Sequence, residues 1–133
     1  MKISYLFDAE KNIYFKKVSG EITLKEAISS LQDSSFYDLT KNLYIVEDVR
    51  DVVYKFPLKK LYSFINNSQQ HLPQNILIFQ SLITHSKEVI VFGNIFKTVL
   101  SSHKYKLSIF SEPEKAEEWV IQKQKVYGTV VSI

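Results

Sequence analysis

The chain of 133 residues contains no cysteine and only three glycines and three prolines. The absence of cysteine excludes disulfides, thiolate metal sites and cysteine nucleophiles. Three glycines spread over the whole chain cannot form a dinucleotide-binding fingerprint or a P-loop, so the common nucleotide-cofactor enzymes are excluded as well. The three histidines, His71, His85 and His103, fit no metal-ligand spacing. We therefore expect neither a metal nor any other cofactor.

The sequence also lacks a long apolar run. Its most apolar region, Val89–Leu100, is interrupted by polar residues and falls short of the about 20 residues of a membrane-spanning helix. The apolar start of the chain stops at Asp8 without a small-residue cleavage site, which argues against a secretion signal. The net charge is only +3, and 45% of the residues are apolar. We therefore expect a bacterial-type cytoplasmic protein with no membrane span, although the absence of cysteine fits an oxidising compartment equally well. With this small net charge, we do not expect nucleic acid as a partner.

What the chain does contain is 14% aromatic residues, many of them in β-branched and aromatic runs typical of strands. Two such runs, Ile3–Phe7 and Ile13–Val18, flank a polar turn and predict an antiparallel hairpin. We expect Gly20 to end the second strand. Thr23 and Glu26 have the spacing of a capping box, which predicts a short helix after the hairpin.

Three continuous apolar runs predict strands that are buried on both faces: Leu43–Val46, Ile76–Phe79 and Leu107–Phe110. Apolar residues at helical spacing predict two helices between these strands, over about Pro57–Gln70 and His85–Ser102. Gly93 in the latter helix indicates close packing of the helix on the sheet. A last helix is expected to begin at a second capping box, formed by Ser111 and Glu114.

The resulting order, β-β-α-β-α-β-α-β-α, predicts an α/β sandwich with a mixed sheet. An N-terminal hairpin is followed by three strands joined by crossover helices. We expect right-handed crossovers whose helices cover both faces of the sheet. No linker or repeat divides the chain, so we expect one domain over residues 1–124. Residues 125–133 then form a C-terminal tail or an edge strand.

Several segments carry a resemblance to a known family. The hairpin end Gly20–Thr23, the strand that closes on Asp48–Arg50 and the segment Leu107–Val120 resemble the small bacterial SpoIIAA-like, or STAS-like, domains. The resemblance implies this fold and a binding role. Some STAS domains are phosphorylated on a serine just after the strand that here ends at Asp48. Val49–Val53 contains no serine or threonine, so this chain lacks the phospho-acceptor.

The candidate site lies at the end of the third predicted strand. Asp48, Arg50 and Asp51 stand where open α/β sheets bind ligands, and two carboxylates beside an arginine suit a polar ligand or acid–base work. The alternative is structural, with strand-end acids that cap the next loop and pair with Arg50. Tyr54 and Phe56 follow in the loop as candidates for a pocket lining or a partner surface.

We find no catalytic constellation in the sequence and therefore expect a non-catalytic regulatory or protein-interaction domain. The alternative is a small-molecule or lipid-binding domain with a pocket between the Asp48–Phe56 loop and the long third helix. A hydrolase or lyase that uses Asp48 and Asp51 is the third class. The expected partner is another protein or a second copy of the chain, and a homodimer would form through an edge strand or through Val126–Ile133.

Overall fold

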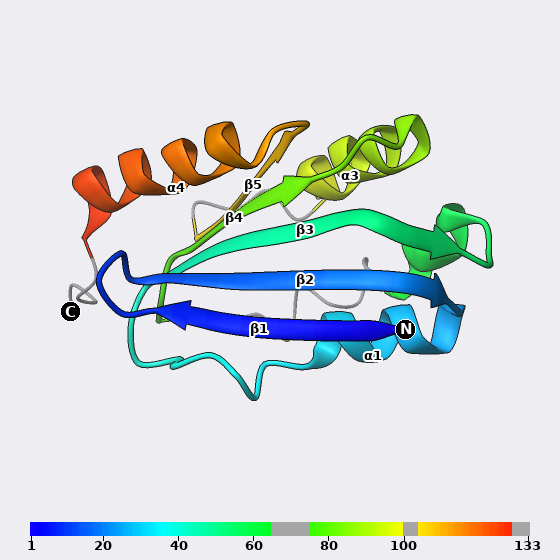
Figure 1. Ribbon diagram of the computed structural model, residues 1–133, viewed down its shortest axis with the longest axis horizontal. Coiled ribbons are helices and arrows are strands. Elements are labelled where there is room, and N and C mark those ends of the chain that lie inside the picture. Colours follow the sequence, from blue (N-terminus) through cyan, green and yellow to red (C-terminus); the bar gives the residue numbers. More distant parts are fainter. Residues whose placement is uncertain (65–74, 100–103, 129–133) are drawn as a thin grey trace.

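The structure is a computed structural model that describes residues 1–64, 75–99 and 104–128 (Figure 1). Its five-stranded sheet has the order β1-β2-β3-β4-β5, with β1 and β2 antiparallel and all other neighbours parallel. The predicted α/β fold with a mixed sheet, an N-terminal hairpin and crossover helices is confirmed. The elements are β1 (Lys2–Asp8), β2 (Ile13–Ile22), α1 (Leu24–Gln32), β3 (Leu43–Tyr54), the 3-10 helix η1 (Leu58–Leu61), β4 (Ile78–Ile83), α3 (Lys87–Val99), β5 (Tyr105–Phe110) and α4 (Pro113–Tyr127).

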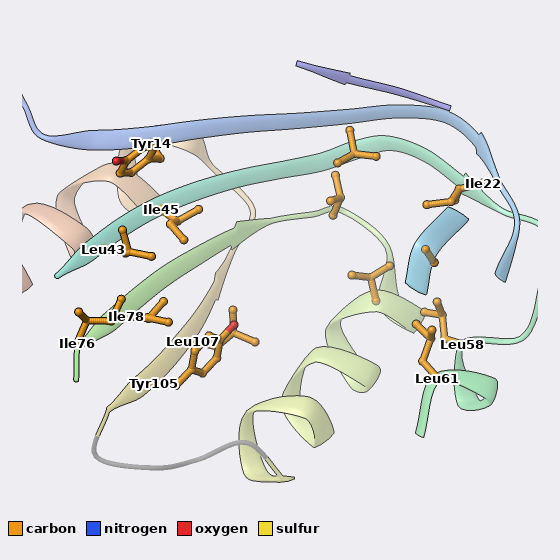
Figure 2. Close-up of a cluster of buried hydrophobic side chains, with 14 residues drawn as sticks. Tyr14, Ile22, Leu43, Ile45, Leu58, Leu61, Ile76, Ile78, Tyr105 and Leu107 are labelled. Carbon is orange, nitrogen blue, oxygen red and sulfur yellow. The ribbon is translucent and has the colours of Figure 1, made fainter. Parts of the chain in front are cut away.

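The crossover segments cover one face of the sheet, not both as the sequence suggested. Because each parallel strand is added on the same side of the previous one, right-handed crossovers all fall on the same face. We call this the crossover face, and its buried cluster joins the strands to α1, η1 and α3 (Figure 2). The opposite face is covered by α4, whose Ala116 and Val120 are fully buried. We call it the α4 face.

The hairpin and the first helix form as predicted. Thr23 Oγ1 accepts a hydrogen bond of 3.2 Å from the Glu26 backbone, and Glu26 Oε1 accepts one of 3.0 Å from the Thr23 backbone. This is the predicted capping box. The prediction for Gly20 is wrong, because β2 continues through it to Ile22. Gly20 has a φ of +89°, which glycine adopts without steric cost, and so the strand passes it without ending.

The buried strands are longer than their apolar runs. β3 was expected to end at Asp48 but runs on to Tyr54, because its second half pairs with the far end of β2. β4 begins two residues later than predicted and extends to Ile83. Polar side chains interrupt both apolar runs but still take part in the backbone ladder. The segment between Asp33 and Asn42, which connects α1 to β3, holds no regular element.

The second helix begins as the 3-10 turn η1, and the end of its predicted range, residues 65–70, lies outside the described residues. In α3, a Cβ built on Gly93 would stand 2.6 Å from the Cδ1 of Ile109. The predicted close packing of this helix on the sheet is therefore confirmed. The end of the predicted range, up to Ser102, lies outside the described residues, as do His71 and His103.

The last helix starts one residue away from the predicted capping position. Its N-cap is Glu112, which makes no side-chain capping bond, and Pro113 occupies the first turn. The expected Ser111 and Glu114 capping box is therefore wrong, because the fixed φ of Pro113 sets the helix start and moves Ser111 outside the cap. Helix α4 continues to Tyr127, so the predicted tail begins as helix, and residues 129–133 lie outside the described part.

Candidate functional site

A β-bulge brings the three charged residues of the predicted site to one face of the sheet. Lys17 of β2 lies opposite Asp48, and Ser19 lies opposite Asp51, so two residues of β3 stand against one of β2. Val49, in the bulge, and Val52, after it, both belong to the crossover face. Side chains alternate in a strand, so the bulge leaves the charged residues around it on the α4 face.

Asp48 and Arg50 form a compact ion pair on this face. Arg50 donates from Nε to Asp48 Oδ1 at 3.0 Å and from Nη2 to Asp48 Oδ2 at 2.8 Å, and its backbone N–H donates to Oδ1 at 3.0 Å. Partial burial acts to raise the pKa of Asp48, but the hydrogen bonds and charge of Arg50, with the charge of Lys17, outweigh it and lower that pKa. Asp48 is therefore an ionised acceptor of three hydrogen bonds, all of them from Arg50.

Asp51 has a cation partner of its own, since Lys17 Nζ lies 3.4 Å from its Oδ2. This pair is exposed, with more than half of each side chain accessible to solvent. Each carboxylate thus has a cation of its own as its nearest charged partner, Arg50 for Asp48 and Lys17 for Asp51. Asp48 and Arg50 border a groove of about 270 Å³ between the hairpin and the first turns of α4. The structural alternative holds for the pair of Asp48 with Arg50, but Asp51 pairs with Lys17 and neither acid stands at a strand end, because β3 continues to Tyr54.

Tyr54 and Phe56 lie on the crossover face and do not join the charged group. Both pack against its apolar cluster, with their rings edge to face and 5.9 Å between centroids. Burial, followed by the charges of Glu47 and Glu88, raises the pKa of Tyr54 to about 12. The five residues predicted as one site are therefore divided between two faces of the sheet.

The crossover face contains two adjoining cavities between the sheet and the helices that cover it. The inner cavity, of about 120 Å³, is lined almost entirely by apolar side chains from the sheet, α1, η1 and α3, and it includes Tyr54. The outer cavity, of about 430 Å³, lies beside α1 and the loop after it and has more polar walls. Among the described residues, six border both cavities: Ser30, Leu31, Glu47, Gln80, Phe96 and Tyr105.

A row of polar side chains crosses this apolar face where the two cavities meet. Gln80 Nε2 donates to Glu47 Oε1 at 2.6 Å, and the Tyr105 hydroxyl donates to Gln80 Oε1 at 2.6 Å. At the other end, Lys16 Nζ lies 3.9 Å from Glu47 Oε2 and donates to Ser30 Oγ at 3.0 Å. We call Lys16, Glu47, Gln80 and Tyr105 the polar row. Strands β2, β3, β4 and β5 contribute one residue each.

The polar row is largely shielded from solvent, so its hydrogen bonds contribute to stability and fix the direction of its donors and acceptors. Lys16 is 5% exposed, which is rare for a lysine and requires the carboxylate that lies beside it. Burial, followed by the charge of Glu47, raises the pKa of Tyr105, so its hydroxyl remains a donor throughout the physiological range. The row thus presents a fixed set of donors and acceptors to the two cavities.

The sequence held a signal for the polar row that a search for motifs does not detect. In the strand Ile13–Val18, alternation places Lys16 on the same side as Tyr14 and Val18, both of which are buried. A lysine at an inward position of a strand predicts a buried acceptor nearby. The identity of the acceptor depends on strand order, which alternation does not reveal.

Comparisons with known protein families, with curated proteins and with solved structures find no significant match. Within the described part of the chain, no helix is both long enough and apolar enough to cross a bilayer. His85, the histidine that the structure describes, lies with its Nε2 2.9 Å from the carbonyl oxygen of Ser111, a contact that links the ends of two loops. Function must therefore be argued from the geometry of the crossover face.

Proposed function

We propose that the chain is a non-catalytic domain of SpoIIAA-like, or STAS-like, architecture that binds a small amphiphilic molecule on its crossover face. The observation that carries this proposal is the polar row at the junction of an apolar cavity and a more polar one. An apolar portion of the ligand occupies the inner cavity, and one hydrogen-bonding group meets the row from the outer side.

The size and character of the cavities support this assignment. Small-molecule sites usually measure about 300–1,000 Å³ and combine apolar walls with a few well-placed polar groups. The outer cavity, at about 430 Å³, falls in that range, and the inner one, at about 120 Å³, adds room for a short apolar group. A large lipid does not fit such a volume. A ligand of modest size with one polar end does.

The same contacts support a binding role in preference to catalysis. General acids and bases in enzymes have pKa values near the working pH, whereas the pKa of Asp48 is lowered and that of Tyr105 is raised. Asp51 is occupied by Lys17. The segment from Lys55 to Leu61, between the end of β3 and the end of η1, also contains no serine or threonine, so the proposal includes no phosphorylation switch there.

The proposal is tested by filling the inner cavity. Ala27 on α1 lines this cavity and is 5% exposed, so Ala27→Leu places a larger apolar side chain inside it. Ser29 lies on the exposed side of the same helix, and Ser29→Leu is the matched control. The probe is anilinonaphthalene sulfonate, an apolar fluorophore with one anionic group. We expect a fluorescence titration to show dye binding of similar affinity to the native chain and to Ser29→Leu. The affinity of Ala27→Leu for the dye should be at least about tenfold lower.

Native mass spectrometry of the purified chain provides the second measurement, since it reports any small molecule that co-purifies. The expected result is a bound mass that the Ala27→Leu protein lacks. Equal dye affinity in all three proteins would contradict the assignment to the inner cavity. If Ala27→Leu unfolds, Tyr105→Phe replaces it, because it changes one hydroxyl of the row and keeps the ring.

A regulatory or protein-interaction role is the second candidate, and one observation favours it. Leu6 on β1 and Val53 on β3 both lie on the α4 face, and they are 64% and 52% exposed. Exposed apolar side chains on a sheet face are typical of surfaces that bind another protein. Affinity capture with the native chain and with Leu6→Ser tests this role, and a partner retained equally by both proteins would contradict a contact at Leu6.

A further inference from the structure

The edge strand β1 lacks the features that protect the opposite edge strand, β5, from pairing with another chain. In the sheet of the described residues, β1 is the terminal strand and pairs with β2 alone (Figure 1). The other terminal strand, β5, is contacted by both α3 and α4 and carries an exposed lysine, Lys106. Natural edge strands are usually protected by proline, charge, a bulge or a covering element. Between Ile3 and Phe7, β1 has no proline, no charged residue and no bulge.

The sequence of β1 is complementary to itself in the antiparallel direction. Centring a two-fold axis on Tyr5 places Lys2 opposite Asp8 of the partner subunit, and the symmetric pair repeats this contact. Ile3 then faces the partner's Phe7, and Ser4 faces the partner's Leu6. Oppositely charged residues directly across two strands stabilise the pairing, whereas like charges oppose it.

The charges at the two ends of β1 are available for this pairing. Within the described part of the chain, neither Lys2 nor Asp8 takes part in an ion pair, although Asp8 accepts a hydrogen bond from the Lys11 backbone. A shift of the register by two residues would set Lys2 against the partner's Leu6 and remove both charge contacts. The ends of the strand thus select one register.

Exposed apolar side chains on both faces of β1 support the same pairing. Leu6 is 64% exposed on the α4 face, and Phe7 is 40% exposed on the crossover face beside Tyr14. Phe36, which stacks on Tyr5 with 4.7 Å between ring centroids, is 38% exposed. On the α4 face, Leu6 of one subunit lies diagonally across the two-fold axis from the partner's Leu6. On the crossover face, the aromatic side chains of Tyr5, Phe7 and Phe36 lie close to those of the partner subunit. A second copy therefore covers apolar surface on both faces at once.

We infer that the chain forms a two-fold symmetric homodimer by antiparallel pairing of β1 with the partner's β1, centred on Tyr5. Since each subunit contributes five strands, the product is one continuous ten-stranded sheet. The interface is isologous, as a two-fold axis requires, and no residue of β1 lines either ligand cavity. It is independent of the small-molecule function proposed above.

A charge exchange tests both the dimer and its register. Sedimentation velocity should show a dimer for the native chain and a dissociation constant at least roughly tenfold weaker for Lys2→Asp or Asp8→Lys, because two attractive pairs become repulsive. The double variant Lys2→Asp/Asp8→Lys should restore the dimer. Lys25→Asp on α1 is the control with the same charge change away from the edge. A native chain that is monomeric at about 100 μM would overturn the inference, and so would a dimer that ignores these exchanges.

Disulfide trapping supplies a readout that does not depend on the charges. Because the chain has no cysteine, each introduced thiol is unique. Ser4 and Leu6 are both exposed, and directly opposed residues of antiparallel strands have Cα atoms about 4.5–5.5 Å apart, within disulfide range. Mixing Ser4→Cys with Leu6→Cys should give a cross-linked heterodimer on mild oxidation. Mixing Leu6→Cys with Ser29→Cys should not, and equal yields from the two mixtures would contradict the register.

Discussion

Gln80 on β4 donates a 2.6 Å hydrogen bond to Glu47 on the neighbouring parallel strand β3, inside the largely apolar layer of the crossover face. The Gln80 amide oxygen accepts a 2.6 Å hydrogen bond from the Tyr105 hydroxyl, so the two partners together fix which way the Gln80 amide points. This arrangement turns a buried charge at Glu47 into a network that reaches the far edge of the sheet. Networks of this kind stabilise a fold only when each member is satisfied, which makes them sensitive to single substitutions.

Lys16→Met is expected to destabilise the fold far more than Lys17→Met. Lys16 is buried beside Glu47, and removing it leaves an uncompensated carboxylate, at a cost of about 3 kcal/mol in the free energy of unfolding. The neighbouring Lys17 points to the opposite face, and its exposed pair with Asp51 is worth about 0.5 kcal/mol or less. Urea denaturation of both variants measures the difference. Equal effects would contradict the burial of the Lys16 charge.

Asn42→Ala is expected to cost about 2 kcal/mol in the free energy of unfolding, because it leaves the partly buried backbone N–H of Leu77 without its acceptor. Tyr44→Phe should cost less, about 1 kcal/mol, since Asn42 still donates to the carbonyl oxygen of Gly128 that both side chains share. Thermal unfolding of the two variants provides the comparison. A larger effect for Tyr44→Phe would show that the contact with the end of α4 dominates.

Asp48→Asn should reduce stability near neutral pH by about 1 kcal/mol, the usual size of a partly exposed charged hydrogen bond. The folded-state pKa of Asp48 is lowered, so ionised Asp48 stabilises the fold above its unfolded pKa of about 3.9. That contribution is lost as the pH falls through the folded-state pKa. The stability difference between native and Asp48→Asn proteins should therefore persist at pH 7 and shrink below about pH 4. A difference that stays constant down to pH 2 would contradict the lowered pKa.

Gly93→Ala should change stability by less than about 1 kcal/mol, because the better helix propensity of alanine offsets the displacement of the Ile109 methyl group. Gly93→Leu should be destabilising by about 2 kcal/mol or more, since a large side chain must separate α3 from the sheet. Combining each of these two variants with Ile109→Ala in a double-mutant cycle measures the coupling free energy between positions 93 and 109. No coupling would mean that the helix does not lie against Ile109.

The element types were readable from local patterns, because hydrophobic periodicity and the Thr23 capping box act within a few residues. The ends of elements were less readable. β3 seemed to stop at Asp48 because charged residues follow it, but backbone pairing with β2 tolerates charge on an uncovered face. The β-bulge beside Val49 depends on that pairing and leaves no local signature.

The candidate site shows the same division between local and long-range information. Asp48 and Arg50 could be predicted to pair because they are two residues apart, and in the structure Arg50 Nη2 lies 2.8 Å from Asp48 Oδ2. The polar row joins residues as far apart in the chain as Lys16 and Tyr105, and only the strand order brings them together. Tyr54 and Phe56 were grouped with the acids by sequence proximity, although the alternation of the strand separates them.

The monotonic strand order has a consequence for how the molecule is built. Each parallel strand is laid against the strand before it in the chain, so every addition uses a template that has already been synthesised. Sheets whose middle strands come last must hold their early strands unpaired until the chain is complete. Here the hairpin formed by Lys2–Ile22 is the first template, and growth proceeds in the direction of translation. The mean sequence separation of strand contacts stays short for a largely parallel sheet, which favours rapid folding.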